Sequence, residues 1–229
     1  MTTPIIKIQQ LDKVFSTDDM LTHALQRINL EVSQGEYVSI SGPSGCGKST
    51  LLSIMGLLDF PSSGKMFFEG VDISHLSLDE AANIRNEKIG FIFQQFNLID
   101  DLSVYENIAL PLHYAKNKLS KKVIRERVKS CLELVGMSEK AKHKPPQLSG
   151  GQQQCIAIAR SLVTQPSILL VDEPTGNLDS KSSDHIMKIL EALNKQGTTL
   201  CVVTHDIRYA EMANRKVYLL DGQVLGQVE

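Results

Sequence analysis

Short apolar runs alternate along the chain with longer segments in which apolar residues recur at helical spacing. The short runs predict β-strands, and the periodic segments predict α-helices. The predicted strands cover residues 5–11, 28–32, 36–41, 65–70, 89–94, 167–174, 198–206, 216–222 and 223–229. The predicted helices cover residues 47–58, 123–136, 152–163 and 181–197, with a short helix near 209–213. Apolar strands that alternate with helices indicate an α/β fold with a largely parallel sheet covered on both faces.

A more charged helical block interrupts this alternation from Val104 to about Lys140. Pro145 and Pro146 end the block, because proline cannot continue a helix. We interpret the block as an insertion into the α/β core.

Composition and charge are those of an ordinary globular protein, since 42% of the 229 residues are hydrophobic and 22% are charged. The formal net charge of -2 argues against a general nucleic-acid-binding protein. Four cysteines without metal-type or redox spacing predict reduced thiols in the cytosol: Cys46, Cys131, Cys155 and Cys201. No signal peptide is evident, and no apolar run approaches the ~20 residues of a membrane span, so we do not expect the chain itself to cross a membrane.

A glycine-rich segment, "GPSGCGKST", joins a predicted strand to a predicted helix, as a phosphate-binding loop requires. Its glycines let backbone N–H groups turn toward phosphate oxygens, and the helix start adds a partial positive charge. Lys48 can reach the outer phosphates, and the Ser49 hydroxyl can bind Mg²⁺, which prefers oxygen ligands. The predicted phosphate-binding residues are Gly42, Pro43, Ser44, Gly45, Cys46, Gly47, Lys48, Ser49 and Thr50.

Polar residues follow three predicted strands. Asp172 ends "SILLVD", where parallel sheets bind ligands, and would hold Mg²⁺ through a water. Glu173 is a candidate general base for the attacking water. Gln94 could contact Mg²⁺ or this water, and His205 ends another strand. Taken alone, each would indicate a solvated strand end or a capping residue; the phosphate loop favours the functional interpretation.

A second Ser-Gly-Gly turn precedes a predicted helix in "QLSGGQQQCIAIAR", residues 147–160. The hydroxyl of Ser149, the N–H groups of Gly150 and Gly151 and the helix start would form a second anion-binding site. This raises the question of why a chain of this size carries two such sites.

Taken together and in this order, "GPSGCGKST", Gln94, "LSGGQQQ", "ILLVDEP", "NLD" and His205 resemble the nucleotide-binding subunits of ABC transporters over nearly the whole chain. "GFIFQQFNLI", "LSGGQQQ" and "DEPTGNLD" are similar to the group that serves lipoprotein release, macrolide efflux and antimicrobial-peptide resistance. The resemblance implies a P-loop NTPase core with a mainly parallel sheet, an antiparallel β subdomain and an inserted helical subdomain. One ATPase domain would span residues 1–229, with core and β subdomain over about 1–95 and 160–229 and the helical subdomain over about 96–159.

The resemblance also implies that two copies pair head to tail around two ATP. Ser149, Gly150 and Gly151 of one copy would then contact the γ-phosphate bound at Lys48 of the other, which answers the question of the second site. Phe15 in "DKVF" matches the position where an aromatic ring stacks on adenine, although a core phenylalanine is the alternative.

Further roles carry over one residue at a time. Glu173 matches the catalytic glutamate, and His205 matches the histidine that contacts the γ-phosphate. Gln94 matches the glutamine that senses Mg²⁺ and the membrane partner, and Asp179 in "NLD" lies in the loop that crosses the dimer interface. The implied catalytic residues are Glu173, His205 and Lys48. The implied metal-binding residues are Ser49, Gln94 and Asp172.

The function implied is an ATP-binding and ATP-hydrolysing subunit that drives a separate integral membrane permease, for export or for lipoprotein or peptide handling. It would lie in the cytoplasm on the inner face of the cell membrane, with the permease docked at the region from Asn97 to Tyr105; no nucleic acid is expected. The alternative is an ATP-dependent assembly or mechanotransmission subunit of a cell-envelope complex without cargo transport. A soluble ABC protein would carry two ATPase domains or a coiled coil, and a small-molecule kinase would not need "LSGGQ".

One residue departs from the family pattern. Arginine usually follows "LSGGQQQ", but the residue here is Cys155. Hydrogen bonds from that arginine are therefore lost. This raises the question of whether the helix after the Ser-Gly-Gly turn is positioned differently and whether hydrolysis is slower. The anion-binding turn itself does not need this side chain.

Overall fold

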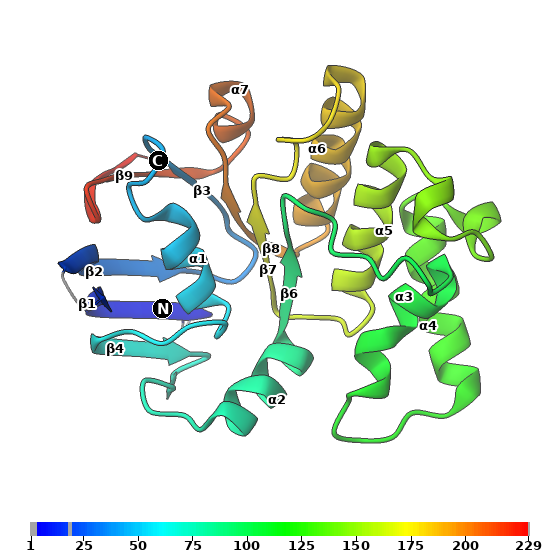
Figure 1. The fold of residues 1–229 in the computed structure, drawn as a ribbon, viewed down its shortest axis with the longest axis horizontal. Helices are drawn as coiled ribbons and strands as arrows, with labels where there is room; N and C mark the ends of the chain where they lie inside the picture. Colours follow the sequence, from blue (N-terminus) through cyan, green and yellow to red (C-terminus); the bar gives the residue numbers. More distant parts are fainter. Residues whose placement is uncertain (1–3, 18–19, 229) are drawn as a thin grey trace.

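The centre of the molecule is a six-stranded sheet (Figure 1). The computed structural model of the protein describes residues 4–17 and 20–228. The sheet order is β10-β9-β3-β8-β7-β6, and all neighbours run parallel except β10, which is antiparallel to β9. Its strands are β3 (Tyr37–Ser41), β6 (Ile89–Ile92), β7 (Ile168–Asp172), β8 (Thr199–Val203), β9 (Arg215–Leu220) and β10 (Gln223–Val228).

Apolar side chains of the central strands alternate between two hydrophobic clusters on opposite faces of this sheet. Leu170 and Cys201 pack into one cluster, together with α1 (Lys48–Met55). Leu169 and Val202 pack into the other, against the helices of the opposite face. Burial on both faces explains why these strands are continuous apolar runs in the sequence.

A second, antiparallel sheet lies beside α1 (Figure 1). Its order is β2-β1-β4-β5, with β1 (Ile6–Thr17), β2 (Met20–Val32), β4 (Ser63–Phe68) and β5 (Val71–Asp72). Ile6, Ile8, Ile28 and Leu30 point into the cluster that also holds α1, whereas the end of the β1–β2 ribbon is exposed.

Three helices that pack on one another form the far end of the molecule: α3 (Val104–His113), α4 (Lys121–Leu134) and α5 (Gly150–Leu162). Short 3₁₀ turns at Ser138–Lys140 and Pro145–Gln147 join α4 to α5. The remaining helices are α2 (Leu78–Lys88), α6 (Ser180–Lys195) and α7 (Ile207–Ala210). Among the described residues, none of these helices is long and apolar enough to cross a bilayer.

This architecture confirms the predicted fold class, with its mainly parallel core sheet, antiparallel sheet and inserted helices. Several local predictions were incomplete. Strand β2 begins at Met20, eight residues before the predicted start, β1 continues to Thr17, and β5 and α2 were not predicted. Helix α2 has a single buried residue, Ala81, so its sequence carries little apolar periodicity. The proposed boundary at residue 160 falls inside the continuous helix α5.

Candidate functional site

The carboxyl ends of β3, β6, β7 and β8 meet at one edge of the central sheet and border a cleft of about 650 Å³. This volume lies within the range of small-molecule sites. Predicted site residues that line the cleft are Ser44, Gly45, Gly47, Lys48, Ser49, Thr50, Gln94, Glu173 and His205. Segments far apart in the chain therefore converge on one space, as expected for parallel strands.

The phosphate loop connects β3 to α1 and packs tightly against β9. A Cβ atom on Gly42 would lie 2.0 Å from the carbonyl oxygen of Leu219, so no other residue fits there without a shift of backbone. The buried ammonium group of Lys48 donates to the carbonyl oxygens of Gly42 and Pro43, at 2.9 and 2.8 Å. Gly47 precedes α1 without a side-chain cap, which leaves the first N–H groups of the helix to a ligand.

Ser49 and Asp172 lie together beneath the loop. The Ser49 hydroxyl donates to the Asp172 carboxylate over 3.3 Å. Burial raises the pKa of Asp172, and the Ser49 hydroxyl partly opposes this rise. A hydroxyl and a carboxylate are hard oxygen donors of the kind that Mg²⁺ prefers.

Glu173 and His205 form a pair at the edge of the cleft. Nδ1 of His205 lies 2.8 Å from a carboxylate oxygen of Glu173. The Glu173 side chain is 14% exposed and the His205 side chain is 71% exposed. Glu173 has a left-handed backbone (φ 46°), a costly conformation for this residue type that turns the chain sharply after β7. The Glu173–His205 pair can hold a carboxylate next to phosphates that bind in the cleft.

Gln94 lies in a segment, residues 93–97, whose backbone carbonyl groups accept hydrogen bonds from side chains of other elements. Asn177 donates to the Gln94 carbonyl at 3.1 Å. From α5, Gln154 donates to the Phe93 carbonyl at 3.5 Å. Arg160, also from α5, donates to the Phe96 carbonyl at 2.9 Å and to the Asn97 carbonyl. Side chains of helix α5 therefore hold in place the segment after β6 that carries Gln94.

The signature turn, Ser149–Gly151, forms the start of α5. Ser149 caps the helix, and the Gln152 side chain accepts from the Ser149 N–H, so the capping box is complete. A Cβ atom on Gly151 would lie 2.8 Å from Oγ of Ser182, which is the reason for glycine at this close approach to α6. Asp179 caps α6 by accepting from the Ser182 N–H at 3.0 Å.

Among the described residues, neither the signature turn nor Asp179 lines the cleft that holds Lys48. Phe15 does not line it either; its ring is 44% exposed, and the Lys13 ammonium lies 4.9 Å from its centroid. Its cross-strand neighbour Thr22 does line the cleft, so Phe15 flanks the site.

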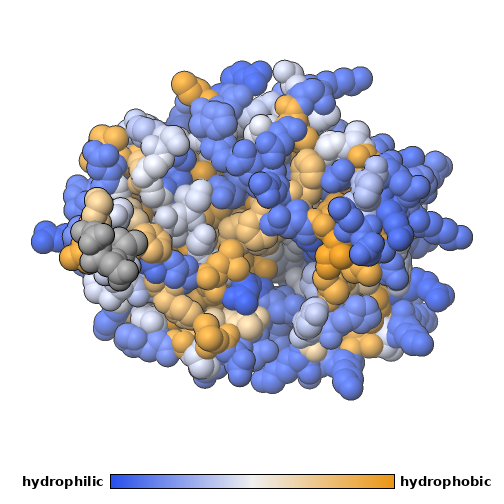
Figure 2. Space-filling view, viewed as in Figure 1, coloured by the Kyte–Doolittle hydropathy of each residue, from blue (hydrophilic) through white to orange (hydrophobic). Residues whose placement is uncertain are grey.

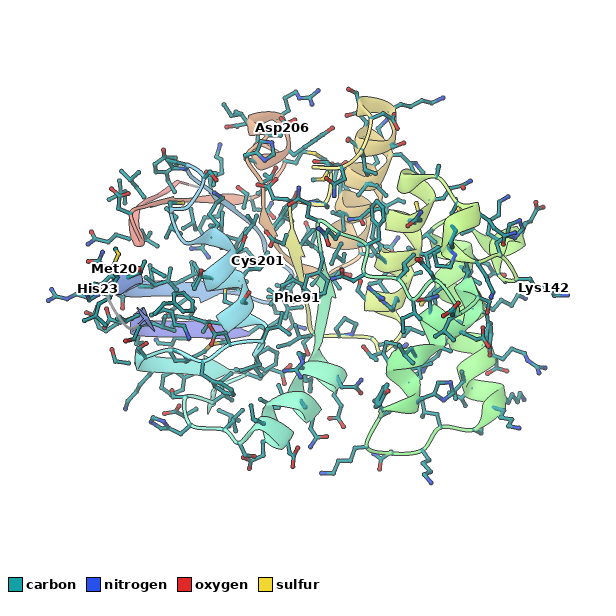
Figure 3. All side chains as sticks on the ribbon, viewed as in Figure 1. Met20, His23, Phe91, Lys142, Cys201 and Asp206 are labelled. Carbon is teal, nitrogen blue, oxygen red and sulfur yellow. The ribbon has the colours of Figure 1, made fainter. Side chains whose placement is uncertain are left out.

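Sequence reasoning missed one wall of the cleft. Strand β2 contributes Thr22, His23, Ala24 and Gln26, and the β9–β10 turn contributes Asp221 and Gly222. The Asp-Gly pair is a hairpin-turn signal, and Gly222 N–H donates to the Cys46 carbonyl at 3.0 Å, which binds the turn to the phosphate loop. Figure 3 shows His23 on β2 and Asp206, the neighbour of His205, at the start of α7.

Cys155 lies in the hydrophobic core between α5 and its neighbours, with 1% of its surface exposed. Burial raises the pKa of its thiol to about 11, so the side chain is a neutral apolar group. Helix α5 begins with a complete capping box despite this residue.

The cleft fits a nucleoside triphosphate with Mg²⁺. Glycine-built backbone, an unshared helix start and a buried ammonium group match the negative charge of phosphates. No group of three or more His, Cys, Asp or Glu side chains able to hold a metal occurs in residues 4–17 and 20–228. The oxygen pair of Ser49 and Asp172 instead suits an ion that phosphates and waters help to coordinate.

Comparison with known proteins agrees with this geometry. A family model described as "ABC transporter" matches residues 25–176. An ABC transporter ATP-binding protein of Methanocaldococcus jannaschii, MJ0796, is 47% identical, over 96% of this chain and 95% of its own. A macrolide export ATP-binding/permease protein, MacB, of Bdellovibrio bacteriovorus is 46% identical over 96% of this chain, which spans only 33% of that longer protein.

A solved structure extends the comparison. The dimeric post-hydrolysis state of the MJ0796 cassette bound to ADP and Pi has a TM-score of 0.89 and 43% identity, covering 98% of both chains. Because the family model covers residues 25–176 and MJ0796 is 47% identical over 96% of this chain, the chain belongs to the ABC transporter family, as an ATP-binding cassette.

Proposed function

We propose that this chain is the ATP-binding and ATP-hydrolysing subunit of an ABC transporter complex, in which two copies enclose two ATP and drive a separate membrane permease. The observation that carries the proposal is the convergence of the phosphate loop, the Ser49–Asp172 pair and the Glu173–His205 pair on one cleft. Full-length similarity to an ATP-binding cassette solved with ADP and Pi supports hydrolysis.

The predicted site residues have separate tasks in this reaction. The loop N–H groups and Lys48 bind the phosphates and stabilise negative charge that develops in the transition state. Glu173 accepts the proton of the attacking water, and His205, 2.8 Å away, orients this carboxylate and can reach the γ-phosphate. Mg²⁺, which Ser49, Asp172 and Gln94 would hold, would neutralise the charge on the β- and γ-phosphates.

The second copy supplies what the cleft lacks. The signature turn lies outside its own cleft, at the start of a helix of 13 residues with partial positive charge. We expect Ser149, Gly150 and Gly151 to bind the γ-phosphate held by the partner copy, with Asp179 at the interface. Two dimeric structures of one relative, MJ0796, support this pairing. ATP then joins the two copies, and hydrolysis separates them.

A groove of about 840 Å³ offers a docking site for the permease. Helix α2 forms one wall, and α3 and α5 contribute Pro111, Tyr114 and Arg160 to the other. Phe93 and Asn97 also line it, so the groove touches both ends of the segment that carries Gln94. Movement of a docked partner would therefore reach the cleft directly. We place the chain on the cytoplasmic face of the membrane, and the MacB relatives favour export.

Hydrolysis without an acceptor tests the function. The purified chain should release phosphate from Mg-ATP in the absence of any second substrate, which a small-molecule kinase would not do. Glu173→Gln should lower turnover about 10²–10⁴-fold and accumulate an ATP-dependent dimer in size-exclusion chromatography. A variant that stays monomeric with ATP and hydrolyses normally would refute both the role of Glu173 and the dimer.

A further inference from the structure

A strongly basic segment lies outside the nucleotide cleft. Residues 113–125 contain five lysines and arginines and no aspartate or glutamate. The whole chain has 24 basic and 26 acidic residues, so acidic residues outnumber basic ones elsewhere. We call this set the α3–α4 basic cluster; its members are Lys116, Lys118, Lys121, Lys122 and Arg125.

All five side chains of the α3–α4 basic cluster are exposed. Helix α4 buries Ile124, Val128 and Leu132 against its neighbours, so its cationic residues face away from the protein. None of the five takes part in an ion pair with any residue that the structure describes. Figure 2 shows that hydrophilic residues cover most of the surface at this end of the molecule. The cluster is therefore a positive surface without internal neutralisation.

The position of the cluster relates it to the groove proposed for the permease. Tyr114 ends α3, lines the groove and is 73% exposed, and the first lysine of the cluster follows two residues later. In Figure 1 the α3–α4 connection lies at the same end of the molecule as helix α2, which forms one wall of the groove, and opposite α6 and α7. A permease docked in the groove would bring the bilayer surface to this end.

We infer that the α3–α4 basic cluster binds the anionic headgroups of the lipid leaflet in which the permease is embedded. Clusters of lysines and arginines bind acidic lipid surfaces, and the attraction decays within a Debye length of the membrane. Tyr114 suits the same setting, because its ring is apolar and its hydroxyl is polar. The inference rests on the proposed docking to a membrane permease.

A lipid surface explains the cluster better than a nucleic acid. The lysines gather over one connection and the first turns of one helix, beside an exposed aromatic ring, and the chain as a whole carries a net charge of -2. A nucleic-acid-binding protein usually shows a longer basic surface and a basic overall balance. Binding to the lipid would orient the cassette and raise the rate at which it meets its permease.

Vesicle sedimentation tests the inference on the purified chain. We expect the chain to sediment with vesicles of phosphatidylcholine and phosphatidylglycerol in equal parts, not with pure phosphatidylcholine, and added salt should reverse the binding. Replacing Lys116, Lys118 and Lys121 by glutamine should weaken binding about a hundredfold, because each lysine near an anionic surface contributes about fivefold. The matched control replaces Lys65, Lys188 and Lys195, which are exposed on β4 and α6, and should bind as the unmodified chain does.

Three outcomes would overturn the inference. Equal losses in both triple variants would mean that net charge alone, not the cluster, attracts the vesicles. Tighter binding to duplex RNA than to the anionic vesicles, lost in the same cluster variant, would assign the cluster to nucleic acid. A chain that forms its ATP-dependent dimer as Glu173→Gln but ignores anionic vesicles would leave the proposed function intact and refute the lipid surface alone.

Discussion

The nucleotide cleft and the signature turn both present N–H groups at the start of a helix, but they differ in the charged side chains around those groups. The cleft lies at the ends of buried parallel strands, and it is lined by the Lys48 ammonium, the Glu173–His205 pair and Ser49, which donates to the half-buried Asp172 carboxylate. The signature turn has no charged residue in its first helical turn, and its own serine already caps the helix. One region can bind ATP and perform chemistry, whereas the other can only add hydrogen bonds and a helix dipole.

This difference shows why the two regions need each other. Without further charge, the signature turn would bind a free phosphate weakly, because a helix dipole stabilises an anion by only about 0.3–1 kcal/mol at an exposed site. Beside a nucleotide already bound at Lys48, the same N–H groups can complete the γ-phosphate coordination. Under the proposed function, this division would make the association of two copies depend on ATP.

Substitution of the signature serine should have the largest effect. Ser149→Arg places a long charged side chain at the start of α5, so copies can no longer close on ATP, and we expect turnover to fall at least about a hundredfold, the range lost with one transition-state donor. Nucleotide affinity of the monomer should not change, because the cleft is intact. Turnover and equilibrium binding of a fluorescent ATP analogue separate these effects. Ser149→Ala, which loses the cap but adds no bulk, is the control; if Ser149→Arg hydrolyses at full rate, the comparison fails.

Arg160 joins the two regions and should give the next largest effect. It is half-buried on α5 and donates to the Phe96 and Asn97 carbonyls, close to Gln94. Arg160→Met leaves both carbonyls without this donor, so the free energy of unfolding should fall by about 1.5–3 kcal/mol. Urea titration measures the loss. Arg160→Lys, which keeps one donor group, should lose less; an unchanged urea midpoint in Arg160→Met would show that α5 does not hold this segment.

Tyr37, the first residue of β3, belongs neither to the cleft nor to the signature turn, so its substitution should change stability alone. Its hydroxyl is buried in β3 with no hydrogen-bond partner among the described residues, and burial raises its pKa. Tyr37→Phe removes this unsatisfied group, so the protein should become more stable by about 1 kcal/mol, with turnover unchanged. Thermal unfolding and phosphate release measure the two quantities. A loss of stability would reveal a buried partner for the hydroxyl.

The smallest effect is a pH-dependent change in stability through Asp12, on strand β1 of the antiparallel sheet. Hydrogen bonds from the Ser63 hydroxyl and the Arg27 N–H lower the pKa of Asp12 from its ordinary 3.8. A lowered pKa stabilises the fold above pH 3.8, and this contribution disappears as the pH falls through the lower value of the folded state. Because Asp12 is partly exposed and solvent screens its interactions, the effect should stay below about 1 kcal/mol. Asp12→Asn should be less stable than the unmodified protein at pH 7, and this difference should narrow at pH 3; an equal difference at both pH values would contradict it.

The sequence predicted the cleft better than its surroundings. Parallel strands are buried on both faces, so their apolar runs identify β7 and β8. Glu173 and His205, shortly after these runs, line the cleft. Helix α2 escaped prediction because it is mostly exposed, although its capping box, Ser77 with Glu80, was a usable signal. The β2 wall of the cleft could not be predicted, because its exposed end carries no alternating apolar pattern.

The hydrogen bonds from side chains to backbone carbonyl groups also could not be predicted from the sequence. The sequence predicts that Gln154 and Arg160 lie on one helix. It does not predict that their side chains donate to carbonyl groups of the segment after β6. Such contacts depend on how α5 packs against the central sheet, which is set by tertiary structure. The assignment of Phe15, the signature turn and Asp179 to a shared site also needs a second copy, so these roles stay predictions.

Mixing two inactive variants tests the shared site most directly. Lys48→Ala disables the cleft and Ser149→Arg disables the signature turn, so each variant alone should be inactive. In a mixed dimer, the intact cleft of the Ser149→Arg copy meets the intact signature turn of the Lys48→Ala copy. The account predicts that the mixture hydrolyses ATP well above the sum of the separate variants. A mixture no more active than that sum would contradict the claim that one nucleotide is bound by two copies.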